Sequence, residues 1–227
     1  MWIKRCAFTT LVGLGLYGLT STAQAADFDV FLNTTSILGG TYFLDFSLSD
    51  GQVASSGLAD TNNTVTVSNF DLGGGTAGTV LPPVGNVSNA AAIASGLTLV
   101  DGDANGVADF TQGFTPGTYL KFRVSTTSAV DAGAVPDKFL FHLLDSGLNV
   151  ITTGDPSSQD GILTLDYTHL NLTSSDVGAF GTTNGSGVGA PKVTTTPEPG
   201  AVALLVSLGS YGSLLAYRRR KAFRRCR

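Results

Sequence analysis

The chain has almost no glutamate, and few basic residues lie away from its two ends. Sixteen aspartates fall between residues 26 and 196, whereas the only glutamate is Glu198. Four basic residues share that stretch, so its formal net charge is −12; they are Lys121, Arg123, Lys138 and Lys192. An acidic surface of this kind repels phosphate backbones. We therefore exclude nucleic acid as an expected partner and favour metal ions or neutral sugars.

Cysteine and histidine are also scarce. The two cysteines, Cys6 and Cys226, both lie in the terminal segments, so the middle of the chain can form neither a disulfide nor a thiolate metal site. The two histidines are His142 and His169, and no Gly-x-Ser-x-Gly motif accompanies them. A packed or edge histidine is the simpler interpretation of each. The sequence predicts no catalytic residue, no organic cofactor and no enzymatic activity.

The glycine-rich stretch from Gly73 to Gly78 formally matches the dinucleotide-binding pattern Gly-x-Gly-x-x-Gly. That pattern needs a helix immediately after it, so that backbone N–H groups can meet the pyrophosphate. Pro82 and Pro83 follow closely and oppose such a helix. A glycine loop between two strands is the better interpretation.

The N-terminus has the features of a secretory signal peptide. Two basic residues precede an apolar run over residues 7–19, and Ala23 and Ala25 supply the small-x-small pattern that a signal peptidase accepts. We predict that residues 1–25 form the signal peptide and that cleavage follows Ala25.

The C-terminus combines an apolar run with a basic tail. Residues 200–217 carry no charge, and 18 helical residues span about 27 Å, enough to cross a bilayer. The basic residues that follow would keep the tail cytoplasmic by the positive-inside rule. The first of them are Arg218, Arg219 and Arg220. A single transmembrane helix is therefore expected here.

Pro197, Glu198 and Pro199, the apolar run and the terminal arginines follow one another in an order that resembles the PEP-CTERM sorting signal of Gram-negative bacteria. The resemblance covers residues 197–227, and Thr196 stands where that family usually has valine. It implies that a membrane-embedded exosortase recognises the Pro-Glu-Pro motif and processes the chain nearby. The helix would then be a temporary inner-membrane anchor, and the product would be released or attached at the cell surface. An ordinary permanent single-span anchor is the alternative.

Alternating apolar residues predict a β-rich middle part. Leu44, Phe46 and Leu48 share one side of residues 42–49, and residues 119–125 alternate in the same way. Four further strands are expected over residues 28–32, 64–70, 138–145 and 162–167, whereas only residues 90–95 look helical. Many short strands with turn-forming residues between them predict an all-β fold, an antiparallel β-sandwich of which a jelly roll is one form.

The domain organisation follows from these segments. We expect one β-sandwich ectodomain over residues 26–180, followed by a flexible stalk rich in Gly, Thr and Ser over residues 181–196. Residues 110–117 also resemble, more loosely, stretches of the small β-rich ectodomains common among PEP-CTERM proteins.

Residues 101–109 match the first half of an EF-hand-type calcium loop. Oxygen ligands at positions one, three, five and nine, with glycine at position six, could surround a calcium ion. These ligands would be Asp101, Asp103, Asn105 and Asp109. Position twelve is Gln112, which cannot supply the usual bidentate carboxylate. A solvated turn is the simpler alternative, since the same residue types form turns.

The sequence favours an exported, non-enzymatic protein of the cell surface or extracellular matrix. The PEP-CTERM resemblance implies an association with extracellular polysaccharide and biofilm. Two alternatives stay open: a carbohydrate-binding module that uses outward aromatic residues such as Phe43 or Tyr119, and an envelope polysaccharide hydrolase in which two aspartates converge.

Overall fold

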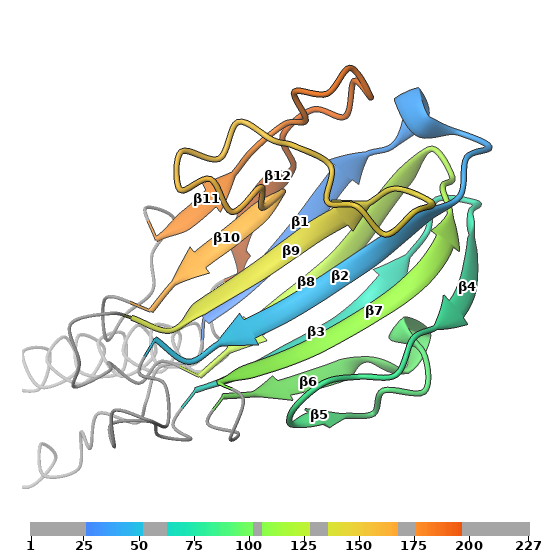
Figure 1. Ribbon diagram of the computed structural model, residues 1–227. Coiled ribbons are helices and arrows are strands. Elements are labelled where there is room, and N and C mark those ends of the chain that lie inside the picture. Colours follow the sequence, from blue (N-terminus) through green and yellow to red (C-terminus); the bar gives the residue numbers. More distant parts are fainter. Residues whose placement is uncertain (1–25, 52–62, 102–105, 128–135, 168–175, 197–227) are drawn as a thin grey trace, which may run out of the picture.

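The computed structural model describes residues 26–51, 63–101, 106–127, 136–167 and 176–196 (Figure 1). The predicted signal peptide, the sorting signal and His169 all lie outside these residues. Within the described residues, no helix is long and apolar enough to span a bilayer.

The described chain forms two six-stranded antiparallel sheets, which confirms the all-β prediction and is consistent with a β-sandwich. Sheet A has the strand order β12-β1-β8-β3-β6-β5, and sheet B has the order β11-β10-β9-β2-β7-β4. The strands are β1 Ala26–Asn33, β2 Tyr42–Ser49, β3 Thr64–Asp71, β4 Thr76–Val80, β5 Val87–Ser88, β6 Leu97–Val100, β7 Val107–Thr115, β8 Tyr119–Thr126, β9 Lys138–Leu144, β10 Leu163–Asp166, β11 Val177–Ala179 and β12 Lys192–Thr196.

Little of the described chain is helical. Two short 3₁₀ helices, η1 (Thr35–Ile37) and η3 (Ile93–Ser95), are present. The second replaces the helix expected over residues 90–95. Its C-cap is Gly96, whose φ of 76° suits glycine, and the strand β6 starts at the next residue.

The two sheets enclose one hydrophobic core. The inward residues of β2, Leu44, Phe46 and Leu48, are each fully buried, as the alternating pattern predicted. Phenylalanine rings from both sheets surround Phe46; they belong to Phe70, Phe122, Phe139 and Phe141. These rings lie on strands far apart in the sequence, so the aromatic cluster joins sheet A to sheet B.

A polar side chain occupies an inward position of β7. Gln112 of β7 is buried, and its amide accepts a hydrogen bond from the Ile93 N–H at 2.8 Å and donates one to the Gly78 carbonyl at 2.9 Å. Both polar ends of the amide are therefore satisfied, which removes most of the cost of burying it. The contact also joins β4 and η3 to β7.

The glycine run at residues 73–78 is a tight loop and the start of a strand. It connects β3 to β4, and no helix follows it. A Cβ atom on Gly75 would lie 2.3 Å from the Thr115 carbonyl oxygen, and one on Gly117 would lie 2.2 Å from the Gly73 carbonyl oxygen. Close backbone approach, not phosphate binding, explains why glycine occupies these positions.

The prediction of a flexible stalk over residues 181–196 is wrong. Thr182 and Val188 are joined by a backbone hydrogen bond of 2.8 Å, and Val188 is 2 % exposed. The residues that follow form β12, which pairs with β1 from Asp27 opposite Thr196 to Phe31 opposite Lys192. Segments rich in Gly, Thr and Ser can form ordered structure as well as flexible linkers. Composition alone did not indicate that this segment pairs with β1.

Candidate functional site

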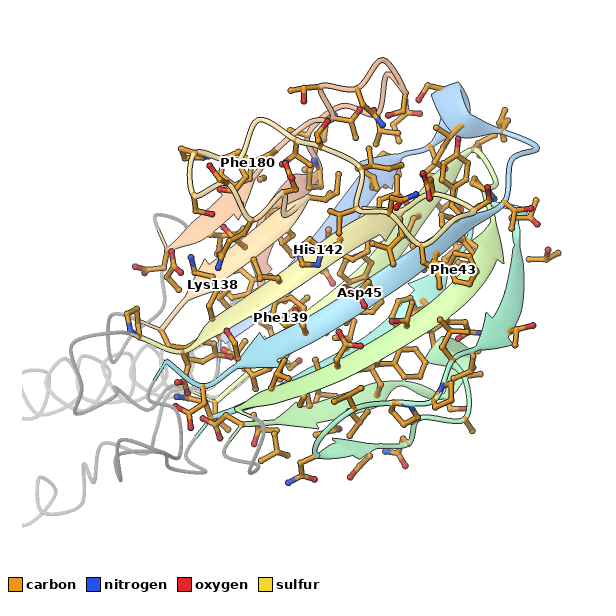
Figure 2. The ribbon with its side chains drawn as sticks, viewed as in Figure 1. Phe43, Asp45, Lys138, Phe139, His142 and Phe180 are labelled. Carbon is orange, nitrogen blue, oxygen red and sulfur yellow. The ribbon has the colours of Figure 1, made fainter. Side chains whose placement is uncertain are left out.

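A cluster of ionisable side chains lies on the outer face of sheet B. Asp45 on β2 is directly opposite His142 on β9 and Thr111 on β7 (Figure 2). His142 Nδ1 lies 3.0 Å from Asp45 Oδ2, and Thr111 Oγ1 lies 2.8 Å from Asp45 Oδ1. The same hydroxyl is 3.4 Å from Asp109 Oδ1. Three adjacent strands thus place two carboxyl groups and an imidazole together.

The connection between β9 and β10 covers this cluster. It passes over the outer side of sheet B (Figure 1), and the Gln159 carbonyl oxygen lies 3.0 Å from His142 Nε2. Asp155 stabilises the covering segment, because its carboxylate accepts hydrogen bonds from the Ser157 N–H, the Ser157 hydroxyl and the Gly161 N–H. The segment and the sheet therefore meet at His142.

The protonation of the cluster follows from these contacts. Burial lowers the pKa of His142, but the hydrogen bond and charge of Asp45 and the Gln159 carbonyl outweigh burial and leave that pKa raised. Since the Gln159 carbonyl can only accept, His142 Nε2 must carry a proton. Burial, together with the neighbouring Asp45 charge, raises the pKa of Asp109 from 3.8 to about 7. At neutral pH the cluster therefore holds protons that isolated aspartates would have lost.

Acid–base chemistry is possible in such a cluster, but access to it is poor. The side chains of His142 and Asp45 are only 11 % and 13 % exposed. A polymeric substrate would have to displace the segment that contains Gln159 before it reached the carboxyl groups. We therefore assign the cluster a structural role, in which it joins β2, β7 and β9 to the covering segment.

We expect the protein to be more stable at mildly acidic than at alkaline pH. Both His142 and Asp109 have raised pKa values, so each contributes stability below its unfolded value that is lost as the pH rises through the folded value. For Asp109 that value is about 7. The melting temperature should fall by about 5 °C between roughly pH 5.5 and pH 8.5, as measured by calorimetry.

Asp109→Asn isolates the carboxyl contribution. The amide cannot ionise and can still donate to Asp45, so this variant should lose less stability than the wild type at alkaline pH. Asp71→Asn is the matched control, because hydrogen bonds from Gly73 and Tyr119 lower the pKa of Asp71 and its contribution is lost only in acid. An unchanged alkaline slope in Asp109→Asn would rule out this origin of the pH dependence.

The outer face of sheet A carries a different set of residues. Phe31 on β1 stacks on Tyr119 of β8, with ring centroids 5.4 Å apart and planes inclined by 26°. The Tyr119 hydroxyl donates to Asp71 Oδ2 at 2.9 Å. Phe31 is 38 % exposed, so an aromatic pair of restricted mobility is presented to solvent.

Three of the four basic residues between positions 26 and 196 lie on this same face. Lys192 on β12 and Lys121 on β8 are both directly opposite Phe31, on its two sides. Arg123 forms a bidentate ion pair with Asp29, with distances of 2.9 and 3.0 Å. Among the residues that the structure describes, neither lysine makes an ion pair.

Two of the four predicted calcium ligands lie within the described residues, and their surroundings differ. Asp101 is buried, and its Oδ2 accepts a hydrogen bond from the Asn63 N–H at 3.1 Å. Asp109 belongs instead to the Asp45 cluster, while Asp103 and Asn105 lie outside the described residues. The described part of the chain contains no group of three or more His, Cys, Asp or Glu residues able to hold a metal ion. Calcium binding stays a prediction.

The remaining predicted site residues lie outside the described residues. These are the cleavage-site residues Ala23 and Ala25, and the sorting-motif residues Pro197, Glu198, Pro199, Arg218, Arg219 and Arg220. Of the two aromatic residues considered for sugar binding, Tyr119 has the aromatic partner described above, and Phe43 lies on the outer face of sheet B (Figure 2). Phe31 was missed, although its outward direction follows from the alternation of β1.

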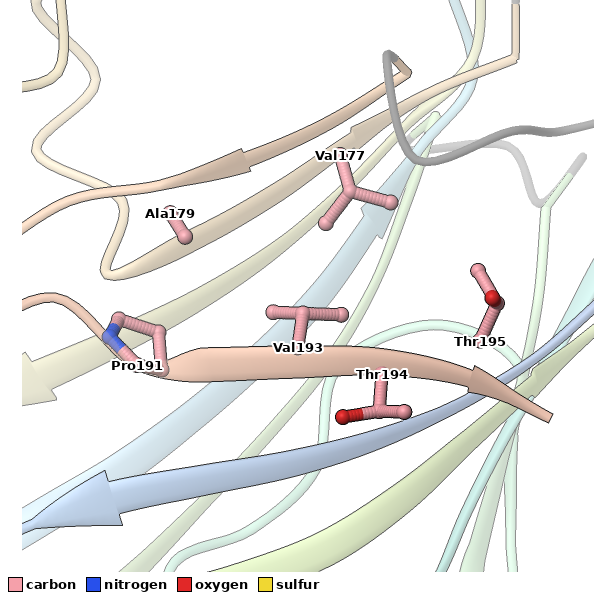
Figure 3. A pocket seen from close by; sticks show the side chains of 6 residues that line it. All are labelled: Val177, Ala179, Pro191, Val193, Thr194 and Thr195. Carbon is pink, nitrogen blue, oxygen red and sulfur yellow. The ribbon is translucent and has the colours of Figure 1, made fainter.

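A groove of about 390 Å³ lies between β11 and β12, the edge strands of the two sheets (Figure 3). Its lining is mixed, with Val177, Ala179 and Val193 beside Thr194 and Thr195. None of the described residues that line it has an ionisable side chain. Comparisons of the chain with protein-family models, curated proteins and solved structures gave no match.

Proposed function

We propose that this chain is an exported, non-enzymatic surface or matrix protein that is processed through its C-terminal sorting signal and associates with extracellular polysaccharide. In this proposal the domain crosses the inner membrane behind the signal peptide. The C-terminal helix holds it until an exosortase-type enzyme acts near Pro197, Glu198 and Pro199.

One observation carries the proposal. Of the described strands, the first, β1, starts at Ala26, next to the predicted signal cleavage, and the last, β12, ends at Thr196, next to the Pro-Glu-Pro motif. These strands are neighbours, and Asp27 is opposite Thr196. Removal of both predicted targeting segments would therefore leave every described strand and its pairing intact, which supports a processed product.

The finer fold that we propose is a jelly roll with additional strands. The order β1-β8-β3-β6 in one sheet, with β2-β7-β4 in the other, matches two interleaved Greek keys in which only β5 departs from the usual sheet. The strands β9 to β12 then extend both sheets on one side. Jelly rolls include lectin domains, which is consistent with sugar binding but does not establish it.

A carbohydrate-binding module is the second candidate, and it is favoured by the exposed Phe31–Tyr119 pair on sheet A. The hydrolase alternative would rely on Asp45 and Asp109, the carboxyl groups that converge on sheet B. The low exposure of Asp45 and the segment that covers His142 argue for binding over hydrolysis.

The proposal predicts two forms of the protein that differ in mass. Intact-mass measurement of native material should find an extracellular form that begins at Ala26 and ends near Pro197, Glu198 and Pro199. A chain with Pro197 and Pro199 replaced by alanine serves as the control and should accumulate in the membrane fraction. If native protein occurs only in membranes and still ends at Arg227, the helix is a permanent anchor and the processing proposal is wrong.

A further inference from the structure

We propose that the outer face of sheet A binds an anionic glycan in which uronic acids alternate with neutral sugars, across the row formed by Lys192, Phe31 and Lys121. This inference rests on the proposed function in one respect, because an exported protein is the kind that meets extracellular glycans. The site itself is argued from the residues of sheet A.

The register of the strands creates the row. Phe31 pairs with Lys192 on one side and with Lys121 on the other, and directly opposite residues project from the same face of a sheet. The two lysine-bearing strands are separated by one strand, so the lysine backbones lie about 10 Å apart. Both lysine side chains are exposed. A ligand that lay across β1 would meet one cation at each side of an aromatic ring.

The aromatic part of the site is held in place before any ligand binds. Tyr119 stacks on Phe31 and is fixed by its hydrogen bond to Asp71, so little side-chain freedom remains to be lost on binding. The apolar faces of sugar rings can lie against such rings. Exposed polar side chains next to the pair, Asn33 and Thr194, can exchange hydrogen bonds with sugar hydroxyls.

The charges favour an anionic ligand over a neutral one. Arg123 is neutralised by its bidentate contact with Asp29, whereas Lys121 and Lys192 have no ion-pair partner among the described residues. Asp71 lies directly opposite Lys121, and the charge of Lys121 helps to lower the pKa values of Asp71 and Asp29, so the row offers two ammonium groups without ion pairs within a surface of mixed charge. Carboxylates on a glycan would complement them.

A sparsely charged glycan fits this surface better than a nucleic acid. Nucleic acids carry a phosphate at every nucleotide, and the net charge of −12 over residues 26–196 opposes so dense an anion. A glycan also presents hydroxyl groups along its whole length, which suits the threonines of β12.

The test measures how fast each lysine of the purified full chain is acylated, read peptide by peptide by mass spectrometry. A hyaluronate oligomer, in which uronate alternates with a neutral sugar, should protect Lys121 and Lys192, and mass action slows their acylation about tenfold at a ligand concentration of roughly ten times Kd. Lys138 is the internal control, because it lies on sheet B and contacts Asp166 at 3.1 Å. The basic tail is the same in every sample and is read in separate peptides.

Two variants connect the protection to the aromatic ring. Phe31→Ala should raise the Kd for the oligomer by about tenfold, while Phe43→Ala on sheet B should leave it unchanged. The inference is overturned if dextran protects the lysines equally well, if a DNA oligonucleotide protects them and the uronate does not, or if Lys138 is protected to the same extent. The acylation measurement does not depend on processing. If the mass test fails but the lysines are protected, only the sorting proposal is refuted.

Discussion

Replacement of Phe46 by alanine is expected to lower the free energy of unfolding by about 3–5 kcal/mol, because a large aromatic side chain is removed from a closed core. Phe46 is fully buried. Its ring centroid lies 4.9 Å from that of Phe141, 5.5 Å from that of Phe122 and 5.8 Å from that of Phe70. Phe122 and Phe70 belong to the opposite sheet, so the cavity would open at the junction of the two sheets. Urea unfolding followed by circular dichroism measures the loss.

Phe43→Ala provides the matched control for Phe46→Ala. Phe43 lies on the same strand with the opposite orientation and is only half-buried, so we expect a loss of about 1 kcal/mol. Phe46→Leu should fall between the two, since it keeps most of the buried apolar volume. Equal losses for Phe43→Ala and Phe46→Ala would mean that the aromatic cluster does not hold the sheets together.

Deletion of residues 181–196 is expected to destabilise the sandwich strongly, although the composition of this segment suggests a dispensable stalk. The deletion removes Val188 from the core, at a cost of about 1.5–3 kcal/mol for that side chain alone. It also exposes the edge of β1 along the five pairs that it makes with β12. Limited proteolysis and thermal unfolding should show a far less resistant protein than a chain that ends at Thr196.

Val188→Ala tests the same contact by a single substitution. Its control is Gly189→Ala, because a Cβ atom on Gly189 would meet nothing within 4 Å. We expect Val188→Ala to lower the melting temperature by several degrees, at about 2–4 °C per kcal/mol for a domain of this size, and Gly189→Ala to leave it nearly unchanged. If the deletion and Val188→Ala have no effect, the segment behaves as the predicted stalk.

The sequence allowed six of the strands to be predicted, and each corresponds to an observed strand: β1, β2, β3, β8, β9 and β10. Most of these strands alternate apolar and polar residues, and the alternation reports which face is buried. The exception is β9, which is buried from Phe139 to Leu144 and does not alternate. The strand β7, next to the edge of sheet B, was not predicted. Its inward positions include Ala108 and the amide Gln112, and its first residues read as part of a calcium loop. A polar residue that is satisfied by two backbone groups gives no local sign of burial.

The residues that lie together on the outer faces of the two sheets could be predicted only in part. Alternation indicated that Asp45 points away from the core, but its contact with His142 joins residues 97 positions apart. Register between distant strands depends on the assembled sheets, and the short strands β4, β5 and β11 carry too few residues to show a pattern. For the same reason the position of Lys192 and Lys121 on the two sides of Phe31 was invisible before the strands were paired.

The pairing of Asp27 with Thr196 also determines how the domain responds to mechanical force. The start of β1 and the end of β12 lie side by side in antiparallel strands, so tension between these two ends would open the pairs one at a time. Tension between the C-terminal end of β12 and a glycan held across Phe31 would instead pull along the strands. The hydrogen bonds between β1 and β12 would then all bear the force at the same time. The domain would therefore open easily when pulled between the start of β1 and the end of β12, and would resist force applied between the end of β12 and the bound glycan.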